Sequence, residues 1–388
     1  MIRYGIFRIN NVYIFGGLRT PLAKHGGHFR SLRPECFTAE LLSALLKQYS
    51  INEVDAIFCG NAVGTGGNLA RLTALLAGID ERVPAVTIDM QCASAAASLD
   101  FAFSRLASGQ GHLYVAGGME SRSLQPVRRY AETDERHALF PHGEYMTAQF
   151  SPKELTENAM LRGAERTAKE EKVSRTELEE WAVRSHARAA AARREGSLQE
   201  LIFPVAGLSK DDGIRETMSF DFLKRLPPLF GTGGLTTAGT SCRTNDGAAL
   251  ALLCSEEYLT KMEKKPEIRL LAMEMSGGDP LYSPRGAMQA ADQLLERMRL
   301  SYEDMAAIEF NEAYAVIDVL FARRYPKLVE RYNTFGGALA YGHPYGASGA
   351  VLLLHLIEAV KKHGGGYGLL SIAGAGGVGE AILLEVCE

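Results

Sequence analysis

The sequence predicts an α/β protein in which helices cover a largely parallel sheet. Around residue 92 a strand pattern, a helix pattern and a second strand pattern follow one another within about thirty residues, the order of a crossover between parallel strands. The same alternation returns near the C-terminus. Many of the 40 glycines occur in pairs between these segments, where they favour turns.

Length and composition describe a folded protein with more than one packed unit. A chain of 388 residues exceeds the size of one small core, so two or three units are expected. Hydrophobic residues make up 46% and charged residues 23%, a balance typical of a soluble globular protein. The formal net charge of −4 gives no sign of a nucleic-acid partner or of binding to an anionic membrane.

The sequence contains no recognisable targeting or membrane segment. Arg3 and Arg8 interrupt the apolar start of the chain, which is not typical of a secretion signal, and no run approaches about 18 apolar residues. The cysteines are scattered, without the C-x-x-C pairs of zinc or redox sites, so no metal site is expected. We therefore expect a cytoplasmic protein with reduced thiols. The six cysteines are Cys36, Cys59, Cys92, Cys242, Cys254 and Cys387.

Three segments around Cys92 form the predicted crossover. From Ala85 onward apolar and polar residues alternate, which predicts a strand. Over residues 93–108 apolar residues recur at helical spacing, and Gly109 follows where a helix cap is expected. Residues 113–116 predict the next strand. Cys92 therefore falls between the C-terminal end of a strand and the N-terminal end of a helix.

The stretch from about residue 125 to 243 differs from both ends of the chain. It is rich in charged residues and is predicted to be mostly helical. Ser174 and Glu177 form a capping-box pattern, and the helix that they begin is expected to end at Gly196. We interpret this stretch as an inserted region of helices and loops.

The C-terminal part repeats the element order of the first part, although residue identity between the two is weak. The expected elements are a helix over 246–253, a strand over 306–310, a helix over 314–323, a helix over 349–362 and a strand over 367–372.

Cys92 is the candidate nucleophile. A cysteine at a helix N-terminus meets unpaired backbone N–H groups and the positive end of the helix dipole, which favour the thiolate. The small residues at 93–97 are expected to leave room for an acyl group above the sulfur. The alternative is a buried core cysteine beside a tightly packed helix. The other five cysteines are expected to be structural.

The densest signal in the sequence is the segment GGALAYGHPYGASG, residues 336–349. Five glycines surround His343 there, and such a loop can bring the backbone and the imidazole close to a substrate. Pro344 fixes the chain direction after the histidine. A lone histidine is usually structural, but this loop composition favours a functional one.

A series of motifs, in order along nearly the whole chain, resembles those of the thiolase family. Cys92 corresponds to the acylated cysteine of that family and His343 to its catalytic histidine. The motifs are RTPLAKHGGHFRSL (19–32), GNLARLTALLAGI (67–79), QCASAAAS (91–98), AGGMES (116–121), TAGTSCRTNDGAA (237–249), NEAYA (311–315) and GHPYGASG (342–349).

The resemblance implies the five-layered α-β-α-β-α fold of that family, with two similar α/β halves and a loop domain inserted in the first. The implied boundaries are 1–120 together with 244–268 for the N-terminal half, 121–243 for the inserted loop domain and 269–388 for the C-terminal half. Members assemble as dimers or tetramers. The short inserted region favours a homodimer here, with a homotetramer as the alternative.

The resemblance also implies an acyl-CoA C-acyltransferase of the acetyl-CoA acetyltransferase or 3-ketoacyl-CoA thiolase type. In the family scheme His343 removes the thiol proton, Cys92 becomes acylated, and Asn311 holds a water that stabilises the oxyanion beside His343. Acyl-CoA and coenzyme A are then substrates, with no tightly bound cofactor. The implied substrate and coenzyme A contacts are Ser241, Cys242, Ala313, Tyr314 and Gly376.

One position departs from the family pattern. The second cysteine of the family, which opens a Cys-x-Gly-Gly-Gly loop near the C-terminus, corresponds to Ala373 here. That thiol moves a proton at the α-carbon of acetyl-CoA, a step that acylation of Cys92 does not need. Two alternatives therefore stay open: a thioester hydrolase or a transferase to a non-carbon acceptor, and, in another class, an idle acyl-CoA-binding subunit.

Overall fold

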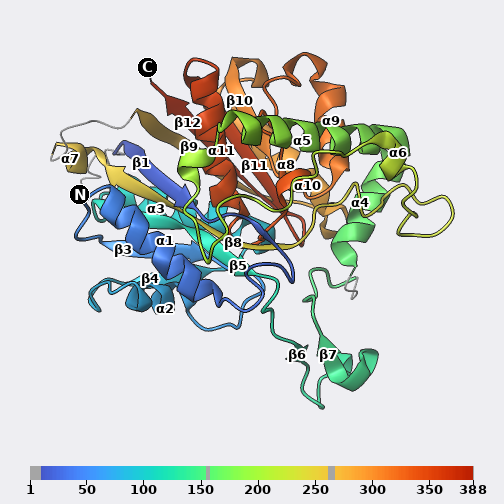
Figure 1. The fold of residues 1–388 in the computed structure, drawn as a ribbon, viewed down its shortest axis with the longest axis horizontal. Coiled ribbons are helices and arrows are strands. Elements are labelled where there is room, and N and C mark those ends of the chain that lie inside the picture. The colour runs from blue at the N-terminus through green and yellow to red at the C-terminus, as the bar shows by residue number, and fades with distance from the viewer. Residues whose placement is uncertain (1–9, 154–157, 261–266, 388) are drawn as a thin grey trace, which may run out of the picture.

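The computed structural model describes residues 10–153, 158–260 and 267–387, which form five layers (Figure 1). The two halves of one mixed sheet alternate with three layers of helices, as the resemblance implied. One outer layer holds α1 (Pro34–Gln48) and α2 (Leu69–Leu76), the central layer holds α3 (Ser94–Ala107) and α11 (Ser348–Lys362), and the other outer layer holds α8 (Gly286–Met298) and α9 (Ala315–Arg324).

Four strands follow the same order in the two halves of the sheet, so the repeat predicted from the sequence is confirmed in the topology, and the N-terminal half has one further strand at its edge. The N-terminal half runs β1-β8-β5-β3-β4 and the C-terminal half runs β9-β12-β11-β10. The N-terminal strands are β1 (Val12–Arg19), β3 (Ala56–Gly60), β4 (Ala85–Ile88), β5 (Leu113–Ser121) and β8 (Asn245–Ser255). The C-terminal strands are β9 (Ile268–Gly277), β10 (Met305–Phe310), β11 (Gly366–Gly374) and β12 (Val378–Val386).

The directions in which neighbouring strands pair are also the same in the two halves of the sheet. In each half the outer strands pair in parallel, and the strands next to the joint between the halves pair antiparallel. The halves meet where β1 pairs antiparallel with β9 over three residues. The predicted domain boundaries stay predictions, and residues 1–9, 261–266 and 388 lie outside the described residues.

Most of the predicted elements are present, and one is wrong. The crossover around Cys92 is confirmed, since β4 and β5 both pair in parallel with β3, which lies between them. Residues 246–253, predicted as a helix, belong to strand β8, which is buried along its whole length. An apolar run of alanine and leucine that is covered on both faces carries no strand periodicity, so the pattern could not separate helix from strand.

The inserted region is less helical than expected. Its helices are α4 (Ala159–Glu170), α5 (Arg175–Glu195) and the short α6 (Phe220–Leu223). The predicted capping box at Ser174 is confirmed, and Gly196 ends α5 in the left-handed conformation at φ 72°. The rest is loop, apart from a small hairpin of β6 (Arg128–Arg129) and β7 (Glu144–Tyr145) that extends away from the body of the molecule (Figure 1).

Short elements complete the chain: β2 (Ala23–Lys24), α7 (Glu256–Leu259) and α10 (Ala338–Tyr341). Among the described residues no helix combines the length and the apolar character needed to cross a membrane.

Candidate active site

A cavity of about 480 Å³ opens between the central layer and the inserted region. Its floor is formed by Cys92, His343 and the backbone that follows β11. The inserted region contributes apolar walls through Met146, Phe150, Met160, Leu161 and Leu229.

Cys92 lies in a single tight turn between β4 and α3, at the position that the sequence predicted. The residue before it, Gln91, has a left-handed backbone at φ 55°, and its N–H donates to the Asp89 carboxylate at 2.8 Å. The Ser94 hydroxyl closes the turn by donating to the carbonyl oxygen of Gln91 at 2.6 Å and accepting from the N–H of Met90. The turn therefore holds the sulfur at the cavity floor.

The Cys92 thiol differs from the thiolate that the helix position suggested. Burial raises its pKa to about 12, and the nearby carboxylates of Glu120 and Asp89 act in the same direction. The backbone N–H groups of Cys92 and Ala375 face the sulfur and oppose this shift. Desolvation outweighs the helix N-terminus here, so the resting group is a neutral thiol.

The imidazole of His343 is held in one tautomer by Ser348. The Ser348 hydroxyl donates to the carbonyl oxygen of Pro344 at 3.0 Å, so its oxygen accepts from Nδ1–H of His343 at 2.6 Å. Nε2 is then the basic nitrogen, and the side-chain amide of Asn311 lies 3.3 Å from it. Burial lowers the pKa of His343 to about 3, so the ring is neutral.

Backbone hydrogen bonds tie together the segments that carry the predicted site residues. The N–H of His343 donates to the carbonyl oxygen of Arg243 at 2.8 Å, and the N–H of Cys242 donates to that of Ala313 at 3.0 Å. The N–H of Asn311 donates to Ser371 in β11 at 3.0 Å. Three segments far apart in the sequence therefore meet at one site.

Glu120, in the AGGMES motif, is a site residue whose role the sequence analysis missed. Its buried carboxylate accepts from the N–H groups of Ala62, Val63 and Gly346 and from the side-chain amide of Asn61, at 2.9–3.2 Å. Burial raises its pKa to about 7. Glu120 thus joins the loop after β3 to the histidine loop. The signal available in the sequence was an acidic residue in the glycine-rich segment AGGMES.

The small residues after Cys92 have a different role from the one expected. They do not line the cavity but allow the central helices to touch, because an added Cβ at Gly349 in α11 would lie 2.4 Å from the backbone nitrogen of Ala96 in α3. An added Cβ at Gly60 would lie 2.5 Å from the nitrogen of Ala95. Close packing, rather than space for an acyl group, explains this run.

The predicted coenzyme A contacts fall mostly at the cavity. Ser241, Cys242, Ala313 and Tyr314 line it. Gly376 does not line the cavity, where the lining residue of that loop is Ala375; Gly376 adopts φ 90° beside the carbonyl oxygen of Phe150, and its role as a contact stays a prediction. The order of glycines in the sequence does not show which backbone N–H group of this loop points into the cavity.

The remaining cysteines differ in their surroundings. Cys59 and Cys254 are buried in the core, Cys36 is half-buried and Cys387 is exposed. Cys242 shares the cavity with Cys92, at a position that the family resemblance implied to be a coenzyme A contact, so it is not a purely structural cysteine of the core. Within the described part of the chain no group of three or more His, Cys, Asp or Glu side chains is arranged to hold a metal ion.

Comparison with known proteins gives one consistent family. The model for "Thiolase, N-terminal domain" matches residues 12–257, and that for "Thiolase, C-terminal domain" matches residues 264–386. A putative acetyl-CoA C-acetyltransferase of Bacillus subtilis (strain 168), YhfS, is 35% identical over 379 residues, which cover 97% of this chain and 99% of that protein.

A second relative and a solved structure agree. The putative acetyl-CoA C-acetyltransferase VraB of Staphylococcus haemolyticus is 33% identical over 373 residues, covering 95% of this chain and 96% of that protein. The crystal structure of the Bacillus anthracis acetyl-CoA acetyltransferase matches with a TM-score of 0.91 at 28% identity, covering 98% of this chain and 100% of that chain. The chain therefore belongs to the thiolase family and is an acyltransferase enzyme with the thiolase fold.

Proposed function

We propose that this protein is an acyl-CoA C-acyltransferase that carries the acyl group on Cys92. The observation that carries the proposal is the floor of the cavity, where a thiol, a neutral imidazole and two backbone N–H groups come together. A nucleophile, a base and an oxyanion site in one partly enclosed space are what acyl transfer requires.

In the proposed first half-reaction His343 takes the thiol proton at Nε2 while the sulfur of Cys92 attacks the acyl carbonyl carbon. The oxyanion at that carbonyl is stabilised beside Nε2–H and the Asn311 amide, or by the N–H groups of Cys92 and Ala375 once the acyl group is on the enzyme. When the acyl donor is a thioester such as acetyl-CoA, collapse of the intermediate expels the coenzyme A thiolate, and His343 returns the proton to it. Because burial keeps the thiol neutral, this proton transfer must accompany attack.

Coenzyme A enters this scheme as a substrate rather than as a resident cofactor. Ser241, Ala313 and Tyr314 line the cavity close to Cys92, and Arg128 supplies a cation on the side of the inserted region. The apolar side chains of Met146, Phe150, Met160, Leu161 and Leu229 suit an acyl chain or a pantetheine arm. We place the protein in the cytoplasm, where its cysteines stay reduced.

We also propose a homodimer formed along the edge of the N-terminal half of the sheet. β4 is the outermost strand there, and Val86 on it is 40% exposed. Phe101 of α3, 43% exposed, packs edge-to-face on Phe58, the register partner of Val86. An open strand edge flanked by exposed apolar side chains favours pairing with a second copy of the chain.

The test is the mass of the intact protein after mixing with acetyl-CoA and with longer acyl-CoAs. We expect an acyl adduct that is absent in Cys92→Ser and reduced in His343→Ala, followed by coenzyme A-dependent cleavage of a 3-ketoacyl-CoA. An adduct that turns over only to free acid would instead support the hydrolase that Ala373 left open. No adduct with any chain length would support the idle acyl-CoA-binding subunit and refute the proposal.

A further inference from the structure

The family pattern needs a second thiol, and the position at which the family carries it is Ala373 in this chain. Ala373 is buried beside the cavity and does not line it. We propose that Cys242 supplies the second thiol, acting as the acid and base at the α-carbon while Cys92 carries the acyl group. This inference rests on the proposed Cys92 acyl-enzyme and names a further catalytic residue for it.

Cys242 and Cys92 face the same cavity, with His343 between their segments. The two thiols are close enough to influence each other, since Cys92 is the strongest contributor after burial to the raised pKa of Cys242. Tyr314 and Tyr345 also line the cavity, and both sulfurs raise the pKa of each of these tyrosines. A small substrate carbon between the two thiols would therefore meet both.

The backbone around Cys242 is fixed between the two other catalytic segments. Its N–H donates to Ala313, two residues after Asn311, and the next residue, Arg243, accepts from the N–H of His343. The adjacent Ser241 hydroxyl donates to the carbonyl oxygen of Thr237 at 3.0 Å. The position of Cys242 is thus set by the same hydrogen bonds that position Asn311 and His343.

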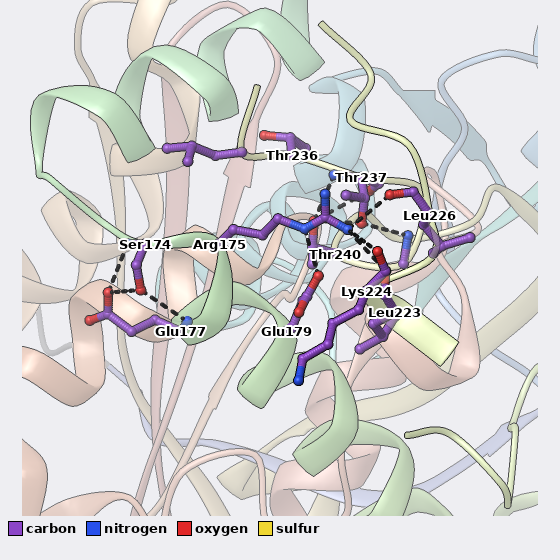
Figure 2. A network of polar contacts seen from close by, with 12 residues as sticks. Ser174, Arg175, Glu177, Glu179, Leu223, Lys224, Leu226, Thr236, Thr237 and Thr240 are labelled. Carbon is purple, nitrogen blue, oxygen red and sulfur yellow. Dashed lines mark hydrogen bonds and ion pairs between the residues drawn. The ribbon is translucent and has the colours of Figure 1, made fainter. Parts of the chain in front are cut away.

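The segment before Cys242 is anchored to helix α4 of the same inserted region. The carboxylate of Glu165 in α4 accepts from the N–H groups of Leu235 and Thr236 at 2.9–3.2 Å. Figure 2 shows the turn of Thr237 and Thr240 next to Arg175, the first residue of α5, whose guanidinium donates to backbone carbonyls at 223–226 and pairs with Glu179. A residue held this way can keep a thiol in one place during the reaction.

The other ionisable groups of the cavity are less suited to proton transfer at the α-carbon of the substrate. His343 already serves Cys92, and the Asp89 carboxylate accepts from the backbone and side chain of Gln91. The phenols of Tyr314 and Tyr345 start from an ordinary pKa of about 10, above the value of about 8.5 for a thiol, and burial raises the pKa of both. Cys242 is half-buried and neutral, so it can donate a proton to a carbanion that forms in the cavity.

The proton balance closes without an outside reagent. In the cleavage direction the Cys92 sulfur, its proton taken by His343, attacks the 3-keto carbon. The carbon–carbon bond breaks, and the acetyl-CoA carbanion takes the proton of the Cys242 thiol. The His343 imidazolium then returns its proton to the Cys242 thiolate. Coenzyme A gives its thiol proton to His343 and attacks the acyl group, and Cys92 leaves with that proton. Synthesis runs the same steps in reverse.

The experiment compares Cys242→Ala and Cys242→Ser with wild type in two assays. One is acylation of Cys92 by acetyl-CoA, read as intact mass, and the other is kcat for cleavage of acetoacetyl-CoA by coenzyme A with both substrates saturating. We expect acylation to persist in both variants while kcat falls by about 10²- to 10⁴-fold, the usual loss for a positioned acid or base. Cys36→Ser, on α1 and away from the cavity, is the matched control and should leave both assays unchanged.

Each other outcome overturns the inference. A change in KM alone would make Cys242 a substrate contact, and parallel loss of acylation and cleavage would make it structural. Full cleavage activity in Cys242→Ser would mean that a hydroxyl suffices and no thiol acid is involved. If wild type itself forms no Cys92 adduct, the proposed function fails as well; an adduct with unchanged cleavage in both variants refutes only the role of Cys242.

Discussion

At the scale of single residues, Cys92 and His343 are both electrically neutral in the resting protein. Burial moves the pKa of the thiol up to about 12 and that of the imidazole down to about 3. A stored thiolate is therefore not the source of reactivity. The fixed tautomer of His343 and the N–H groups of Cys92 and Ala375 are positioned for the charges that develop only during attack.

The raised pKa of Cys92 can be tested with an alkylating reagent. Because only the thiolate reacts, the rate of Cys92 alkylation by iodoacetamide should rise about tenfold per pH unit from pH 7 to pH 10. Quantitative mass spectrometry of the Cys92 peptide measures this rate. The urea-unfolded chain is the control, and its rate should level off near the ordinary thiol pKa of about 8.5. A plateau below pH 9 in the folded protein would contradict the burial argument.

Ala373→Cys tests whether the family position can replace Cys242. Residue 373 lies at the end of β11, two positions before Ala375, whose amide faces Cys92, and it is the position that corresponds to the second cysteine of the family. In the Cys242→Ala background, Ala373→Cys should restore cleavage of acetoacetyl-CoA by at least about tenfold. In wild type the same change should raise the rate little, since one second thiol is already present. Equal rates with and without Ala373→Cys in both backgrounds would show that a thiol there has no effect.

At the scale of elements, the two central helices position Cys92 and His343, the proposed catalytic residues. Cys92 precedes α3, His343 precedes α11, and both helices pack through glycine and alanine. Glu120 adds a polar clamp between β5 and the histidine loop. The geometry of the site therefore depends on how closely these elements approach.

Gly349→Ala should weaken that packing. The added methyl group meets the backbone of Ala96 at 2.4 Å, and overpacking of this kind costs about 1–3 kcal/mol of the free energy of unfolding. Urea unfolding followed by circular dichroism measures the loss. Gly277→Ala is the matched control, because an added Cβ at Gly277 has no heavy atom within 4 Å. Equal stability of the two variants would refute the close-packing explanation.

A second prediction at this scale concerns Glu380 on β12 and the dependence of stability on pH. Both of its carboxylate oxygens are buried without a partner among the described residues, and burial, with Asp100 and Glu274, raises its pKa to about 9. Its folded-state pKa lies above the unfolded value of 4.5, so the folded protein loses stability as the pH rises from 4.5 toward 9, by about 1.4 kcal/mol per unit at most. Glu380→Gln should therefore stabilise the protein at pH 8 and change it little at pH 5. An equal gain at both pH values, measured by urea unfolding, would contradict this assignment.

At the scale of the whole molecule, the repeated fold brings the cysteine turn and the histidine loop to one cavity. Cys92 follows β4 and His343 lies between β10 and α11, so each follows the outermost strand of its half, and the packing of α3 against α11 in the central layer brings the two loops together. The inserted region covers the opening with apolar side chains, while its hairpin extends away from the body (Figure 1). The exposed edge at β4 lies on the N-terminal half and is the proposed dimer surface.

Val86→Lys tests that surface. A lysine on an edge strand opposes pairing with another copy of the chain, so the variant should be a monomer of about 42.2 kDa while wild type has twice that mass. Light scattering coupled to gel filtration measures both. Leu139→Lys, at a 65% exposed position outside the sheet, is the control and should leave the dimer intact. A monomeric wild type, or a dimer in Val86→Lys, would refute the proposed interface.

The sequence by itself determined the fold class, the crossover around Cys92 and the cap of α5, and it singled out Cys92 and His343, which line one cavity. Local periodicity, helix caps and ordered motifs carry that information. Only the tertiary structure decided that residues 245–255 form a strand, since a run covered on both faces has no periodicity to distinguish it. Likewise, the protonation of Cys92, the choice of Ala375 over Gly376 and the shared cavity of Cys92 and Cys242 follow from desolvation and from contacts between distant segments, which no local pattern encodes.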